Sequence, residues 1–108
     1  MNTIAVLKAL GEPMRFKIFS CLLERKHCVR SLSQKLGITE SAISQHLKIM
    51  READMIYGEK YGYHTHYLPK QETLDNLMEL FKAMQRKSID LDRNMAVCQC
   101  EYREREQE

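Results

Sequence analysis

The sequence has few glycines and no long hydrophobic run. Its four glycines are spread thinly along 108 residues, so no glycine-rich loop that could hold a phosphate or a cofactor is formed. No paired carboxylates and no nucleophile with a neighbouring base stand out, so we do not expect an enzyme. No apolar stretch approaches the roughly 18 residues needed to cross a membrane, and Lys8 interrupts residues 1–10, which argues against a signal peptide. These absences predict a cytoplasmic protein without a membrane partner.

The sequence also lacks a large excess of positive or negative charge, since its net charge is only +2. The charges are nevertheless unevenly spread. Residues 1–69 hold ten Lys or Arg and six Asp or Glu, whereas residues 70–108 hold seven and nine. A mildly basic body with an acidic end permits nucleic-acid binding but does not require it. With 44% hydrophobic and 30% charged residues, the composition is that of a single globular domain.

Apolar residues recur at helical spacing through most of the chain. This pattern predicts helices over residues 3–10, 13–25, 30–36, 39–53 and 71–87. Between the last two, residues 55–60 and 63–68 are rich in β-branched and aromatic side chains, which predicts a hairpin with a turn around Tyr61 and Gly62. The helical pattern fades after residue 87. We therefore expect a folded domain over 1–87 and a partly disordered tail over 88–108, with no cofactor required for folding.

The junction between the third and fourth predicted helices has the features of a helix-turn-helix. Gly37 suits the left-handed cap at the end of one helix, and Thr39 is a good N-cap for the next. Two short helices joined in this way and followed by a hairpin form a winged helix-turn-helix. The predicted fold class is therefore mostly α with a small β-hairpin. In this fold the second helix of the helix-turn-helix, here residues 39–53, is expected to enter a DNA groove and is called the recognition helix.

One face of the helix predicted over residues 39–53 suits the major groove of duplex DNA. At 100° per residue, Ile43, Leu47 and Met50 fall together on the core side. The opposite side is polar and consists of Ser41, Ser44, Gln45, Lys48 and Glu52. Glutamine can pair with adenine, serine can meet bases or phosphates, and lysine attracts phosphates. The alternative is an ordinary solvated face, which the preceding turn and the following hairpin make the weaker interpretation.

Three other side chains near this face have more than one interpretation. His46 points away from Ser41 and Gln45 on the same wheel, so we interpret it as structural. Lys60 and Tyr61 fall at the predicted tip of the hairpin, where they could reach a phosphate or the minor groove. A hairpin tip is also a place where polar residues are simply solvated, so both interpretations stay open.

Several segments together resemble the ArsR/SmtB family of metal-responsive repressors. These are ALGEPMRFKI at residues 9–18 with Leu22 and Leu23 after it, HCVRSL at 27–32, SAISQHLKIMREA at 41–53, and the hairpin over 58–67. The resemblance covers residues 4–87. It implies a homodimeric repressor whose first and last helices pair across the dimer, which binds an imperfect inverted repeat and releases it when an inducer binds.

Carried over by position, the family's DNA-contacting residues are Ser41, Ser44 and Gln45, with Glu40 at the edge. The helical wheel selects the first three independently. A dimer is also physically reasonable, because the last predicted helix has more apolar side chains than a thin monomer can cover: Leu74, Leu77, Leu80, Phe81 and Met84.

The four cysteines are the candidates for the inducer site, because in a cytoplasmic protein such thiols are more often free or metal-bound than paired. Cys28 matches the first cysteine of the family's usual pair, but Arg30 stands at the second. The family's other site needs a histidine in the last helix, and residues 71–87 contain none. Cys98 and Cys100 form a Cys-x-Cys pair that can bind one soft ion. We therefore expect a thiolate site drawing on Cys98, Cys100 and Cys28, suited to arsenite or to a soft divalent metal such as cadmium.

Other interpretations of these residues remain. Two of the thiols could instead form a disulfide that changes DNA affinity, or the cysteines could be incidental. Cys21 lies between the apolar residues Ile18 and Leu22 and is expected in the core. For His64 and His66 we favour packing over zinc or nickel binding. The remaining class of function is a winged helix that serves only as a protein-interaction module. Such a module would not need small polar side chains, here Ser41, Ser44 and Gln45, on a face that can approach DNA closely.

Overall fold

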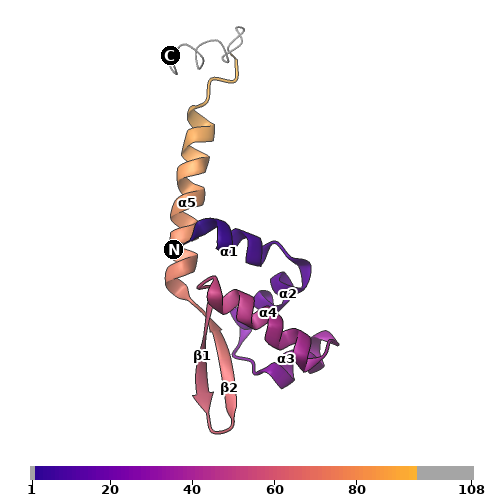
Figure 1. Cartoon of the computed structure of the whole chain (residues 1–108). Coiled ribbons are helices and arrows are strands. Elements are labelled where there is room, and N and C mark those ends of the chain that lie inside the picture. Colours follow the sequence, from indigo (N-terminus) through magenta and orange to yellow (C-terminus); the bar gives the residue numbers. More distant parts are fainter. Residues whose placement is uncertain (1, 95–108) are drawn as a thin grey trace.

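The computed structural model describes residues 2–94 and consists of five helices and one antiparallel hairpin (Figure 1). The elements follow in the order α1 (Thr3–Leu10), α2 (Pro13–Glu24), α3 (Val29–Leu36), α4 (Glu40–Glu52), β1 (Ile56–Tyr61), β2 (His64–Pro69) and α5 (Gln71–Asp90). The predicted winged helix-turn-helix is confirmed. The helix predicted over residues 39–53 becomes α4, with Thr39 as its N-cap and Ala53 as its C-cap.

The corner between α1 and α2 is built by side chains that satisfy helix ends. The Glu12 carboxylate accepts a hydrogen bond of 2.7 Å from the Arg15 backbone N–H, and Pro13 occupies the first position of α2. Arg15 Nε donates to the carbonyl oxygen of Ala9 at 2.7 Å, at the end of α1. These bonds hold the corner between α1 and α2.

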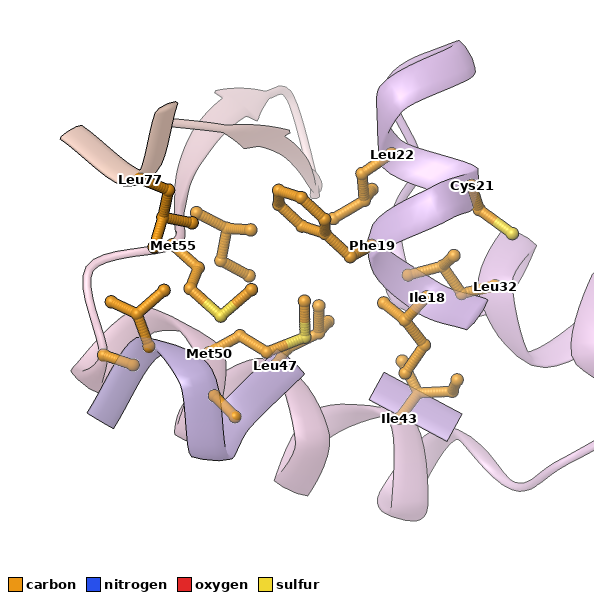
Figure 2. Close-up of a cluster of buried hydrophobic side chains, with 14 residues drawn as sticks. Ile18, Phe19, Cys21, Leu22, Leu32, Ile43, Leu47, Met50, Met55 and Leu77 are labelled. Atoms are coloured by element: carbon orange, nitrogen blue, oxygen red, sulfur yellow. The ribbon is translucent and has the colours of Figure 1, made fainter. Parts of the chain in front are cut away.

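The core lies between α2 and α4 (Figure 2). α4 contributes Ile43, Leu47 and Met50, each at most 2% exposed, and these are the three side chains that the helical wheel placed inward. The remaining buried apolar side chains come from every other element except β2: Val6, Ala9, Ile18, Phe19, Cys21, Leu22, Leu32, Ala53, Met55, Ile56 and Leu77. Burying one such large side chain contributes about 1.5–3 kcal/mol, so this cluster holds α4 in place.

The hairpin pairs Ile56 with Pro69 at its base and Tyr61 with His64 at its end. Its turn consists of Gly62 and Tyr63, one step beyond the Tyr61–Gly62 junction predicted from the sequence. Gly62 has a φ of 60°, and glycine at the first central position is what a type II′ turn requires. The Tyr67 backbone N–H donates to the carbonyl oxygen of His27 at 2.9 Å, which ties the hairpin to the start of α3.

Helix α5 projects away from the body, at the end of the molecule opposite to the hairpin turn (Figure 1). It continues to Asp90, beyond the Lys87 expected from the sequence, and its buried residues are Thr73 and Leu77. Leu77, which we expected on a dimer stripe, packs into the core of its own chain. Further along, Met78, Phe81 and Met84 are 55%, 49% and 54% exposed. Within the described residues, no helix is both long and apolar enough to span a membrane.

Candidate nucleic-acid interface

A tight turn joins α3 to α4 and sets the angle between them. Gly37 has a φ of 70°, and its N–H donates to the Ser33 carbonyl oxygen at 2.9 Å. The Ser33 hydroxyl donates to the Ile38 carbonyl oxygen at 2.6 Å. Thr39 Oγ1 then accepts a bond of 3.1 Å from the Ala42 N–H and starts α4. These three bonds satisfy backbone groups at the two helix ends that have no helical partner, and they hold the turn between α3 and α4.

The polar face of α4 has no partner within the described residues. Ser41, Ser44, Gln45 and Lys48 are all exposed, and none of their side chains makes a hydrogen bond or ion pair there. Glu40 and Glu52, at the two ends of the helix, are exposed as well. A row of unpartnered hydroxyl, amide and ammonium groups on a helix held from behind by the core matches what a major-groove surface requires.

His46 lies at the flank of this helix. Its Nδ1 is 3.4 Å from an Arg15 guanidinium nitrogen and 3.9 Å from Glu12 Oε2. Its side chain is therefore held against the corner between α1 and α2, in agreement with the structural role expected for it. His46 links the recognition helix to the corner and does not belong to the polar face.

The two hairpin candidates, Lys60 and Tyr61, are both exposed but differ in their contacts. Tyr61 is engaged within the chain: Lys26 Nζ donates to its hydroxyl oxygen at 3.2 Å, and its ring lies 4.9 Å from the His66 ring. The Tyr61 hydroxyl and the Glu59 carboxylate, 3.2 Å from the same ammonium group, raise the pKa of Lys26. Lys60 is exposed and has no such partner in the described part of the chain.

Tyr63 was missed by the sequence reasoning. It occupies the turn itself, and its side chain is fully exposed. The signal that could have found it is Gly62, because a glycine in the first position of a two-residue turn assigns Tyr63 to the second. His66, by contrast, packs against Tyr61 as predicted, and His64 at the start of β2 is exposed.

Asp54 connects the end of α4 to α5. It adopts the left-handed conformation with a φ of 62°, and its carbonyl oxygen accepts a hydrogen bond from the Thr73 hydroxyl. Its carboxylate lies 2.8 Å from Lys70 Nζ, and this hydrogen-bonded ammonium group lowers the pKa of Asp54. The recognition helix is therefore fastened at its C-terminal end to the base of the projecting helix.

Two of the four cysteines lie in the described residues. Cys21 is 7% exposed in the core, as predicted. Cys28 is half-buried at the N-cap of α3. Burial raises the pKa of the Cys28 thiol, but hydrogen bonds from the backbone N–H and hydroxyl of Ser31 and from the backbone N–H of Arg30 lower it by more, so the net shift is downward.

The predicted Cys98 and Cys100 ligands lie outside the described residues. Among residues 2–94, no group of three or more His, Cys, Asp or Glu side chains is arranged to hold a metal ion. Cys28 is thus the one predicted thiol ligand that the structure places, and it belongs to no such group of three within that range.

Residues 12–57 match the family model described as "Bacterial regulatory protein, arsR family". The arsenical resistance operon repressor of Bacillus subtilis is 35% identical over 72 residues, which cover 66% of this chain and 69% of that repressor. The chain belongs to the ArsR family. The repressor SmtB of Mycobacterium tuberculosis is 39% identical to this ArsR-family chain over 57 residues, or 53% of the chain, and these span only 42% of SmtB.

The fold of this ArsR-family chain also matches solved structures. HlyU from Vibrio cholerae superposes with a TM-score of 0.64 at 27% identity, covering 76% of this chain and 89% of HlyU. A structure titled as reduced HlyU matches with a TM-score of 0.63 over 76% of this chain and 86% of that one. These relatives are transcriptional regulators, either repressors or, for HlyU, an activator.

Proposed function

We propose that this ArsR-family protein is a cytoplasmic, homodimeric transcriptional repressor that inserts two copies of α4 into an imperfect inverted repeat of duplex DNA. The observation that carries the proposal is the polar face of α4, where Ser41, Ser44, Gln45 and Lys48 are exposed and unpartnered in the described structure. Phosphate contacts hold such a helix in register, and contacts to base edges read the sequence. Glu40, Lys60 and Tyr61 are further candidate contacts, with Tyr61 requiring release from Lys26.

The exposed stripe of α5 supports the dimer. Met78, Phe81 and Met84 are about half exposed, and Ile4 of α1 is 62% exposed. A second copy of the chain that paired through α1 and α5 would cover these side chains. Dimerisation would also hold two recognition helices about 34–36 Å apart, one turn of DNA, as an inverted repeat requires.

We further propose that a thiophilic inducer releases the DNA by binding at Cys98, Cys100 and Cys28, with arsenite the first candidate and soft divalent metals such as cadmium the next. The lowered pKa of Cys28 supports this, because the thiolate is the metal-binding form. The same thiolate is also the form that oxidants attack. Cysteine oxidation is therefore the second candidate signal. The match to a structure titled as reduced HlyU supports testing it.

A gel-shift assay at low salt tests the DNA-binding proposal. The unaltered chain should bind its own promoter region more tightly than an unrelated duplex. Gln45→Ala should weaken the specific complex about tenfold, because a bidentate amide–adenine pair contributes about 1–3 kcal/mol. Gln71→Ala removes an exposed glutamine from α5 and is the matched control. No binding of any duplex by the dimer would contradict the proposal and favour a protein-interaction module.

The signal is tested on the same complex. Arsenite, cadmium, zinc and an oxidant are titrated in turn against the unaltered protein, the Cys98→Ser/Cys100→Ser variant and the Cys28→Ser variant. Arsenite should release the DNA from the unaltered protein and should act much more weakly on both variants. Release that the Cys98→Ser/Cys100→Ser variant leaves unchanged would show that the tail cysteines are not the site.

A further inference from the structure

A cavity of about 300 Å³ opens between the start of α3, the start of α4 and the turn end of β2. Cys28 and Arg30 line it from α3, Glu40 from α4, and Tyr63, His64 and Thr65 from the hairpin. We propose that this cavity binds one phosphate group of the DNA backbone, held by Arg30, Tyr63 and His64. The inference rests on the proposed DNA-binding function and adds to it a contact away from the polar face of α4.

The lining of the cavity supplies donors that have no other partner. The Arg30 guanidinium and the His64 ring are exposed and form no hydrogen bond or ion pair with any described residue, and the same holds for the Tyr63 hydroxyl. Guanidinium groups recognise phosphate oxygens through two parallel hydrogen bonds, and phenol O–H and imidazole N–H groups are ordinary phosphate donors. Arg30 also lies in the first turn of α3, where the helix dipole favours an anion.

The place of the cavity fits the path of a DNA strand. One wall is the start of α4, next to Ser41 of the polar face, and another wall is the hairpin. If α4 occupies the major groove and the hairpin reaches the flanking backbone, the strand between them has to pass over the cavity. A phosphate held there would fix the register of α4 without reading any base.

Two other groups that line the cavity, Glu40 and Cys28, disfavour a bound phosphate. Changes at these residues therefore predict whether DNA affinity rises or falls. The Glu40 carboxylate repels an anion, so Glu40→Gln should strengthen binding to a duplex of mixed sequence, where Glu40 makes no contact to a particular base. A contact from Glu40 to the operator would be lost in the same variant only on the specific duplex. The Cys28 thiol lines the same space. A bulky or anionic adduct on its sulfur would therefore take the place of the phosphate, and chemistry at the thiol would displace DNA directly.

The salt dependence of binding to a fluorescein-labelled duplex of mixed sequence tests the proposal. Each phosphate contact contributes about 0.9 to the slope of log affinity against log salt concentration. Arg30→Gln should lower this slope by about one and weaken binding at low salt about tenfold, because one charged hydrogen-bonded contact is lost. Arg86→Gln removes the same charge from α5, which projects away from the hairpin (Figure 1), and is the matched control.

Several results would overturn the proposal. If Arg30→Gln and Arg86→Gln gave equal slopes while the unaltered chain bound DNA, the phosphate site would be wrong and the proposed function would stand. If the unaltered chain bound no duplex, both would fall. Weaker binding of the mixed-sequence duplex by Glu40→Gln would also contradict the site. Finally, the His64 ring signals in NMR spectra should shift with duplex but not with inorganic phosphate alone, and an equal shift with both would indicate a free-anion site.

Discussion

Cys28 takes a capping position where serine, threonine or aspartate is usual. The backbone N–H groups of the first turn of α3 point toward its sulfur, and the Ser31 hydroxyl accepts a bond of 3.1 Å from the Cys28 N–H. These donors stabilise the thiolate more than burial destabilises it. The thiolate form of Cys28 is therefore more accessible than that of an ordinary cysteine.

The lowered pKa of Cys28 predicts how its reactivity changes with pH. In a Cys98→Ser/Cys100→Ser background, the rate of alkylation by iodoacetamide should rise with pH and reach half its maximum below pH 9.0, the ordinary thiol value. Cys21 should react slowly because it is buried. Mass spectrometry of the modified peptide gives the rate. Ser31→Ala removes one donor and should move the midpoint upward, whereas a midpoint at or above pH 9.0 in its parent would contradict the pKa shift.

At the scale of single residues, the sequence predicted which side chains of α4 are exposed, but it did not predict the side-chain contacts of the hairpin. The placement of Ser41 and Gln45 opposite the buried Ile43 depends only on the period of a helix, which short-range spacing reveals. The contact between Lys26 and Tyr61 joins residues 35 apart in the chain. Its existence depends on how the hairpin folds back over the loop before α3, and no local pattern encodes that path.

At the scale of elements, the angle between α3 and α4 depends on one residue with a left-handed backbone. Gly37 has a φ of 70°, and a Cβ built on it would meet nothing within 4 Å. Any cost of a substitution there is therefore a cost of backbone conformation and not of crowding. This makes the turn a clean place to measure how its conformation contributes to folding.

Gly37→Ala should lower the free energy of unfolding by about 1–2 kcal/mol, because a Cβ disfavours the left-handed conformation. Gly37→Asn should cost less, since asparagine tolerates that conformation better. Urea denaturation followed by circular dichroism measures both. Equal stability of the alanine variant and the unaltered protein would show that the turn can adopt another conformation without loss.

Element boundaries were the least accurate part of the sequence prediction. α5 continues to Asp90 although its apolar pattern fades near residue 87, because extending an existing helix adds one backbone bond per residue and needs no apolar face. The hairpin turn was displaced by one residue because aromatic residues lie on both sides of Gly62 and both suit a strand. Helix caps such as Gly37 and Thr39 were predicted correctly, since capping chemistry is local.

At the scale of the whole molecule, one chain alone does not cover the apolar side chains of the projecting helix α5. Beyond Leu77, α5 has no buried side chain, yet it has Phe81 at 49% and Ile89 at 73% exposure. The excess of apolar residues could be recognised from the sequence, because it exceeds what a short chain can cover. The sequence could not show which of these residues pack within the chain and which stay exposed. Leu77 packs into the core of its own chain, and only the tertiary fold determines where along α5 the exposed stripe begins.

Phe81→Glu should convert the proposed dimer into a monomer, because a charge would be buried in an apolar contact between two copies. Sedimentation equilibrium measures the mass, and the gel-shift assay should show weak binding of the non-specific kind. Arg86→Glu adds negative charge on the opposite side of the same helix and should remain dimeric. A dimeric Phe81→Glu variant would place the dimer contact elsewhere.

The order in which these parts leave the ribosome has a consequence of its own. Except for Thr73 and Leu77, every buried side chain in the described structure precedes α5, so the DNA-reading half has nearly its whole core before the projecting helix is made. An N-terminal unit can fold while the rest of its chain is still being synthesised. The half of the molecule that contains α4 can therefore assemble its core before α5 is complete, and pairing through α5, as proposed above, would follow that step. In that order of events, two chains translated from one message would meet through newly made helices, which favours partners made side by side.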